Sequence, residues 1–143
     1  MNILDPKTFI VCDIVAAIVL LIAFNRYKRW SAIRRYKCKQ NNRAPLSEMD
    51  FCKRLSVDEN NASFVRAIRE NLAKRPSLNP NLIYPEDELW DGFDSEIVEV
   101  FDEPTLNYFC ENYEYFSDDV KCVGDLVKFL IQVCTEAKLA DLK

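Results

Sequence analysis

The chain has 143 residues and a formal net charge of −4, which leaves room for one folded domain of ordinary size rather than two. It has no histidine, and no C-x-x-C pair occurs among its six cysteines, so histidine-dependent catalysis is excluded and a metal site is not expected. Only two glycines and little strand-like alternation favour an all-α fold.

The first predicted element is a transmembrane helix over residues 8–24, preceded by a short extracytoplasmic tail at residues 1–7. The helix contains eleven Ile, Leu, Val or Phe residues and a single charge, Asp13. Inserting the apolar residues is favourable by roughly 5 kcal/mol, which exceeds the cost of about 3 kcal/mol for one aspartate. We expect Asp13 to reach the outer interface. A cleaved signal peptide fits less well, because the basic residues follow the apolar run and no small-residue cleavage site comes after it.

A basic juxtamembrane neck and linker is predicted over residues 25–46. Eight Lys or Arg and no acidic residue occur between Asn25 and Arg43. Because positive charge marks the cytoplasmic side of a membrane helix, we expect a single-pass cell-membrane protein with a cytoplasmic C-terminal domain. Residues 25–39 are expected to continue the helix or to lie along the anionic leaflet, and residues 40–43 to form a polar linker. The residues expected at the membrane interface are Arg26, Tyr27, Lys28, Arg29 and Trp30. Membrane lipid is thus an expected partner, and nucleic acid is not.

Residues 47–143 are predicted to form a helical domain. Ser47 and Asp50 fit a capping box that opens a short helix ending at Leu55. Further helices are expected at 62–75, from the start signal at 102–104 to about 116, and at 123–139. The last helix has an apolar stripe that we expect to be core, formed by Val123, Leu126, Val127, Leu130, Cys134 and Ala137.

An acidic stretch lies in the middle of this domain. Between Glu86 and Asp119 there are thirteen acidic residues and no basic one. Such a surface suits a basic partner protein, whose approach it would accelerate, although acids of this kind also occur simply as a solvated surface. The residues predicted to bind the partner are Glu86, Asp87, Asp91, Asp94, Glu96 and Glu99. A calcium-binding loop starting at Asp87 is not expected, because Val98 occupies the position that requires glutamate.

Four pieces of sequence within residues 66–130 occur in a recognisable order. They are residues 66–73, residues 82–89, the motif Gly92-Phe93-Asp94-Ser95 and residues 123–130. In this order they resemble the first helix, the following loop, the G-x-D-S motif and the last helix of an acyl carrier protein, over about half the chain. The resemblance implies a helical bundle and attachment of 4′-phosphopantetheine to Ser95, at a helix N-terminus that favours a phosphodiester. The sequence departs from the family at Glu96, where the family has leucine, and at Pro104, which interrupts the second helix.

We therefore predict a single transmembrane helix joined to a small acyl-carrier-like helical bundle. Its predicted function is that of a non-enzymatic interaction domain that docks a basic partner through an acidic surface. The alternative is a membrane-tethered acyl carrier that uses Ser95; no other cofactor is expected. An enzyme is not expected, because no glycine-rich loop, metal-ligand set or nucleophile–base pair stands out.

Overall fold

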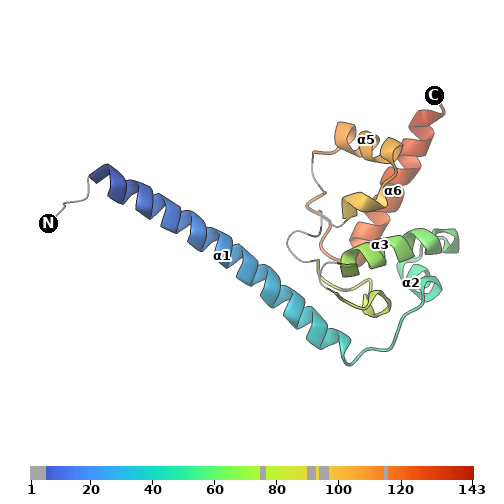
Figure 1. Ribbon diagram of the computed structural model, residues 1–143. Coiled ribbons are helices and arrows are strands. Elements are labelled where there is room, and N and C mark those ends of the chain that lie inside the picture. Colours follow the sequence, from blue (N-terminus) through green and yellow to red (C-terminus); the bar gives the residue numbers. More distant parts are fainter. Residues whose placement is uncertain (1–5, 75–76, 90–92, 94–96, 115) are drawn as a thin grey trace.

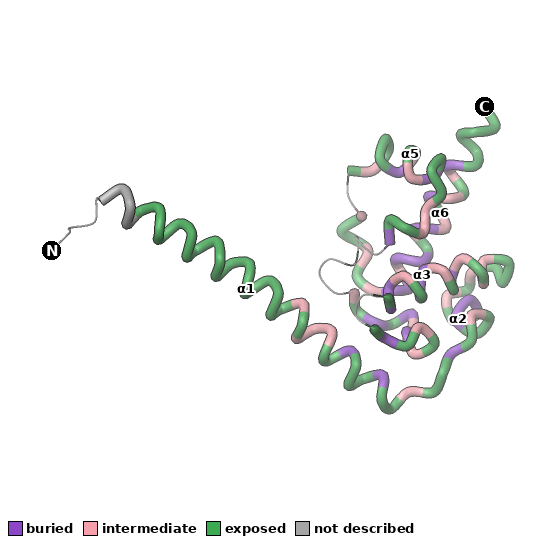
Figure 2. Tube along the Cα trace, in the orientation of Figure 1, coloured by how far each residue is buried: buried purple, intermediate pink, exposed green. Residues whose placement is uncertain are grey.

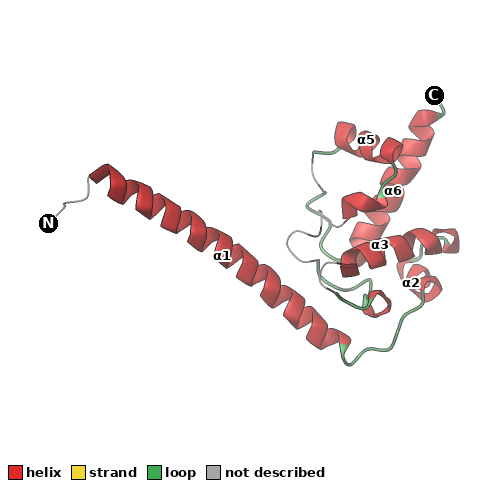
Figure 3. Ribbon diagram, viewed as in Figure 1, coloured by secondary structure: helices red, strands yellow, loops and turns green. Residues whose placement is uncertain are grey.

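The computed structural model describes residues 6–74, 77–89, 93, 97–114 and 116–143 (Figure 1). These residues are mostly helical and contain no β-strand, although Glu88 and Cys122 form an isolated antiparallel bridge (Figure 3). The α-helices are α1 (Pro6–Gln40), α2 (Glu48–Leu55), α3 (Ala62–Lys74), α5 (Glu103–Asn112) and α6 (Val123–Asp141), and the 3₁₀ helices are η1 (Glu59–Asn61), η2 (Pro80–Leu82) and η3 (Val98–Val100).

Helix α1 is long and apolar enough to cross a membrane. Its 35 residues extend about 52 Å at 1.5 Å per residue, and its most apolar window has a mean hydropathy of 2.0. Every residue from Ile10 to Lys28 is exposed (Figure 2). Neither glycine nor proline occurs from residue 7 to residue 40, so the helix continues unbroken into the basic segment. We call residues 25–40 of α1 the neck.

The start of α2 agrees with the predicted capping box. The Ser47 hydroxyl oxygen accepts a hydrogen bond from the Asp50 N–H at 3.1 Å, and the same hydroxyl donates to Asp50 Oδ2 at 2.7 Å. The helix ends at Leu55 because Ser56 adopts a left-handed conformation with φ of 55°. Helix α3 then runs from Ala62 to Lys74.

Helix α5 begins where the sequence predicts but ends earlier. The Asp102 side chain caps it by accepting a hydrogen bond from the Thr105 N–H at 3.0 Å, and Pro104 lies in its first turn. The helix ends at Asn112, before an extended Tyr113, rather than near residue 116. Tyr113 packs its ring against Phe129 of α6, with 5.3 Å between centroids, so a tertiary contact ends the helix.

The hydrophobic core lies between α3, α6 and the segments that cover them. The predicted stripe of α6 faces this core, although Cys134 is only half-buried. The fully buried apolar side chains are Phe51, Cys52, Val65, Ile68, Leu72, Ile83, Ile97, Val123, Leu126, Val127, Leu130 and Val133. A cluster of aromatic rings lies beside this core and joins α5 to α6 and to neighbouring segments of the chain. The rings belong to Phe93, Phe101, Phe109, Tyr113, Phe116 and Phe129.

Arg69 is a buried cation within this core. Its guanidinium lies 5.1 Å from the centre of the Phe51 ring, and Nη2 donates a hydrogen bond to the Leu46 carbonyl at 2.9 Å. Among the described residues, Nε and Nη1 have no hydrogen-bond partner. Burial lowers the pKa of Arg69. The side chain thus ties the segment before α2 to α3, a role that helical periodicity does not predict.

Candidate functional site

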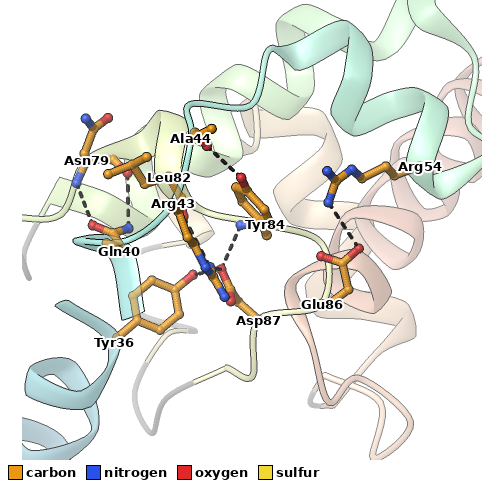
Figure 4. A network of polar contacts seen from close by, with 10 residues as sticks. All are labelled: Tyr36, Gln40, Arg43, Ala44, Arg54, Asn79, Leu82, Tyr84, Glu86 and Asp87. Atoms are coloured by element: carbon orange, nitrogen blue, oxygen red, sulfur yellow. Dashed lines mark hydrogen bonds and ion pairs between the residues drawn. The ribbon is translucent and has the colours of Figure 1, made fainter. Parts of the chain in front are cut away.

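Polar contacts, some of them buried, join the end of α1 to the rest of the domain (Figure 4). The Tyr36 hydroxyl donates a hydrogen bond to Asp87 Oδ2 at 2.5 Å, and Arg43 Nη1 lies 2.7 Å from both oxygens of that carboxylate. The Tyr84 N–H donates to Oδ2 at 2.7 Å. Asp87 is only 2% exposed. We call this group the neck–domain junction; it comprises Tyr36, Gln40, Arg43, Asn79, Tyr84 and Asp87.

Gln40 and Tyr84 make the remaining contacts of the junction. The Gln40 amide donates to the Asn79 carbonyl at 3.2 Å and accepts from the Asn79 N–H at 3.3 Å. The Tyr84 hydroxyl donates to the Ala44 carbonyl at 2.6 Å, and the Arg43 guanidinium lies 4.6 Å from the centre of the Tyr84 ring. These contacts attach the last turns of α1 and the residues that follow it to the domain at several points.

The junction corrects two sequence-based predictions. Asp87 is predicted to bind a partner at the surface, but its carboxylate is buried and used within the chain. Residues 40–43 are predicted to be a linker, but Gln40 ends α1 with 6% exposure and Arg43 pairs with Asp87. A buried carboxylate requires such partners, and they lie too far away in sequence for a local pattern to reveal them.

Tyr36 remains a hydrogen-bond donor over the whole physiological pH range. Burial, and then the hydrogen bond to Asp87, raise the pKa of Tyr36 far above its ordinary value. Tyr36 therefore keeps its hydrogen bond to Asp87, and together with Arg43 this contact attaches the end of α1 to the domain.

Two of the other predicted partner-binding acids are exposed and already have ion-pair partners. Glu86 Oε1 lies 3.7 Å from Arg54 Nη1, and Glu99 Oε2 lies 2.9 Å from Lys74 Nζ. Exposed pairs of this kind contribute about 0–1 kcal/mol, so a partner protein can replace them at small cost. The remaining predicted residues, Asp91, Asp94, Glu96 and the attachment residue Ser95, lie outside the described residues.

A second acidic group lies at the end of α5 and in the loop that follows. It consists of Glu111, Glu114, Asp118 and Asp119, which we call the acidic corner. All four side chains are exposed, and none forms an ion pair within the part of the chain that the structure describes. The sequence predicts the acidic stretch but does not single out these residues. The sequence signal for an acidic surface here is that no basic residue occurs from 86 to 119.

The residues predicted at a membrane interface lie on α1 where the apolar part gives way to the neck. Four of them are exposed, and Arg29 is half-buried. The Lys28 ammonium lies 4.9 Å from the centre of the Phe24 ring, so this side chain points back toward the apolar part. The Tyr27 and Trp30 rings lie next to each other, with centroids 6.3 Å apart.

An open hollow beside α2 and α3 contains two carboxylates. It has a volume of about 520 Å³, and its lining includes Glu48, Glu70 and Arg66. Arg66 Nε donates to Glu48 at 3.1 Å, and this hydrogen bond holds the pKa of Glu48 below its usual range. Glu48 is thus poorly suited to donate a proton in catalysis. In the described residues, no group of three His, Cys, Asp or Glu side chains is arranged to hold a metal ion.

No protein-family model, curated protein or solved structure matches this chain. The resemblance to acyl carrier proteins therefore depends on the residues that suggested it. The long second helix that this resemblance implies is interrupted, as Pro104 indicated: η3 ends at Val100, and an extended Phe101 precedes the cap of α5.

Proposed function

We propose that the protein is a single-pass membrane protein that holds a non-enzymatic interaction domain at the cytoplasmic face of the cell membrane. This domain docks a basic partner protein through its exposed acidic residues. The neck–domain junction is the observation that carries the proposal, because it fastens the domain to a helix long and apolar enough to span a bilayer. A domain fastened in this way is displayed close to the membrane surface.

The exposed apolar surface of α1 supports the membrane anchor. Every residue from Ile10 to Phe24 is exposed, and soluble monomers rarely leave so large an apolar surface in water. Eight basic residues follow the apolar run, whereas Lys7 alone precedes it, and this excess supports a cytoplasmic domain.

Extraction and labelling together test the anchor and its orientation. We expect alkaline carbonate to leave the full-length chain in the membrane fraction. Cys38 and Cys110 are exposed, so a membrane-impermeant maleimide should label them only after the cytoplasmic face is opened. An Asn2→Cys variant is the matched control, since its new thiol should be labelled on intact cells. Release by carbonate contradicts the anchor, and labelling of Cys110 on intact cells contradicts the orientation.

The acidic corner supports docking of a basic partner. Its four carboxylates are exposed and have no internal ion pair in the described structure, so binding a cation breaks no existing contact there. Concentrated negative charge also attracts a basic protein over a distance and raises the association rate.

Site-specific photo-crosslinking tests this docking surface. A photoreactive residue at Asn107, exposed on α5, should yield a discrete protein adduct in cells. The double variant Glu111→Lys with Glu114→Lys should abolish the adduct. The double variant Glu59→Lys with Glu70→Lys makes the same change in net charge at exposed positions near α3 and should preserve it. An adduct that survives the first variant argues against docking at the acidic corner.

A membrane-tethered acyl carrier is the second candidate, and one observation favours it. Two of the segments that resemble a carrier contact each other: the Gly124 N–H donates to the Pro85 carbonyl and the Val123 N–H to the Asp87 carbonyl, both at 2.8 Å. Co-expression with a phosphopantetheinyl transferase tests this function. A mass gain of one phosphopantetheine group that disappears in Ser95→Ala supports the carrier, and an unchanged mass argues against it.

A further inference from the structure

The neck has two chemically different faces. Successive residues of an α-helix are turned by about 100°, so Ala32, Tyr36 and Gln40 share one face, and this face contacts the domain. The side of the neck turned away from this face, which we call the rear face, carries Tyr27, Trp30 and Arg34, with Lys37 at its edge. All four of these side chains are exposed. The rear face is thus directed away from the domain.

The rear face combines two neighbouring aromatic rings with cations that form no ion pair in the described structure. The Arg34 guanidinium lies 5.3 Å from the centre of the Trp30 ring, which in turn lies beside Tyr27. Within the described structure, Arg34 and Lys37 form no ion pair. Four basic residues of the domain do form ion pairs, namely Lys53, Arg54, Arg66 and Lys74. Aromatic and basic side chains beside an apolar helix are the combination found at membrane–water interfaces.

We propose that the rear face docks onto the head groups of anionic lipids and tilts α1, so that the domain on the opposite face is lifted away from the bilayer. This inference rests on the proposed membrane anchor. To that anchor it adds a ligand, which is an anionic lipid surface. It also adds a feature that sets the orientation of the domain relative to the membrane.

The distances along α1 explain why docking requires tilt. Lys37 lies thirteen residues beyond Phe24, about 20 Å along the helix axis. A head-group layer extends only about 5–8 Å beyond the hydrocarbon, so an upright helix leaves Arg34 and Lys37 in water. Tilting toward the rear face, within the range of up to about 40° seen for membrane helices, brings these side chains back to the head groups.

The charge distribution determines the direction of the tilt. Residues 86–119 of the domain contain acidic residues and no basic ones, so an anionic leaflet repels that side of the molecule. The same leaflet attracts Arg34 and Lys37 on the other side of the neck. Both forces turn α1 in the same sense, because the domain and the rear face lie on opposite sides of the helix.

Tryptophan fluorescence of the full-length chain tests the proposal. Trp90→Phe leaves Trp30 as the only tryptophan, and the protein is reconstituted in phosphatidylcholine vesicles with or without phosphatidylserine. Bromine-labelled acyl chains should quench Trp30 roughly twofold more strongly when phosphatidylserine is present, because tilt moves the ring toward the bilayer. In the double variant Cys12→Ser with Cys38→Ser, a fluorophore on the exposed Cys110 should transfer less energy to acceptor-labelled lipid under the same conditions.

Two charge-reversal pairs separate the rear face from net charge. Arg34→Glu with Lys37→Glu should abolish the response to phosphatidylserine. Arg35→Glu with Lys39→Glu makes the same charge change beside Glu88 and Leu89, on the flank near the domain, and should preserve it. Equal quenching in both vesicles, or equal loss in both pairs, overturns the proposal. A chain that carbonate strips from the vesicles contradicts the anchor itself, whereas an inserted chain without a lipid response contradicts the rear-face proposal alone.

Discussion

Asp87 accepts contacts from three separate parts of the chain, and its replacement tests the neck–domain junction. In Asp87→Ala, the Tyr36 hydroxyl and the Arg43 guanidinium both lose their acceptor. Removing one partner of a buried pair costs 3–5 kcal/mol, and we expect about 2–4 kcal/mol here because Arg43 is still 23% exposed to water. Thermal unfolding of the full-length chain in detergent, followed by circular dichroism, measures the loss.

Glu86→Ala is the matched control for this prediction. Its exposed pair with Arg54 contributes at most about 1 kcal/mol, so the melting temperature should change little. Equal melting temperatures for Asp87→Ala and Glu86→Ala would mean that the junction does not stabilise the protein.

At Gly124, two effects of a substitution on stability oppose each other. Alanine normally favours a helix over glycine by about 1 kcal/mol, and this preference alone would make Gly124→Ala in α6 stabilising. A Cβ at this position, however, would lie 2.7 Å from Leu55 Cδ2 and 3.1 Å from the Pro85 carbonyl oxygen. That oxygen also accepts the Gly124 N–H at 2.8 Å and cannot withdraw freely.

We therefore expect Gly124→Ala to destabilise the domain by about 1–3 kcal/mol, the usual cost of overpacking. The free energy of unfolding, obtained from urea titration in detergent, measures this effect. Leu55→Ala in the same chain should recover part of the loss, because it removes the closest clash. A stabilised Gly124→Ala variant would show that the approach of α6 to Pro85 is looser than described.

Tyr113 makes stability depend on pH in the alkaline range. Its hydroxyl donates to Glu136 Oε2 at 2.8 Å, and this hydrogen bond, followed by burial, raises the pKa of Tyr113 from 10.0 to about 12. Since the folded pKa lies above the unfolded one, the contribution is complete below pH 10 and is lost as the pH rises toward 12. The melting temperature of Tyr113→Phe should thus fall less than that of the natural chain between these pH values. A constant difference between the two chains across this range contradicts the linkage.

At the scale of elements, the apolar part of α1 should tolerate few further charges. Val15 lies near the middle of residues 8–24 and is exposed. An arginine at the centre of a membrane helix costs about 2.5–3.5 kcal/mol, which is comparable with what the apolar run retains after Asp13. Val15→Arg should therefore move much of the chain into the carbonate-soluble fraction, whereas Val15→Ala should not. Full retention of Val15→Arg in membranes would show that α1 is held there by something other than its own hydrophobicity.

The helices were predictable where their signals are local. The caps at Ser47 and Asp102 and the apolar stripe of α6 involve residues within a few turns of one another, and the structure has those elements at the predicted positions. The end of α5 was not predictable in this way. Tyr113 leaves the helix to contact Glu136 and Phe129, which are distant in sequence and invisible to a helical pattern.

At the scale of the whole molecule, the contrast between local signals and long-range contacts also applies to the charged residues. Some of their positions could be predicted from the sequence, and others could not. The exposed positions of Glu86 and Glu99 agree with an acidic surface. In sequence Asp87 cannot be told from its acidic neighbours, yet it is buried, because Tyr36 of the neck and Arg43 just beyond it contact its carboxylate. A neck that appears to be a basic spacer therefore forms part of the domain.

Two shortened chains test where the domain begins. Residues 31–143 keep Tyr36 and Gln40, whereas residues 41–143 lose both and leave Asp87 with fewer donors. Losing two buried polar contacts and the packing of Tyr36 should cost about 2 kcal/mol, which lowers the melting temperature by roughly 10 °C for a domain of this size. Calorimetry of the two chains measures the difference, and Tyr36→Phe in the longer chain should fall between them. If the neck were only a linker, both shortened chains would melt at the same temperature; a lower value for residues 41–143 assigns the last turns of α1 to the folded domain.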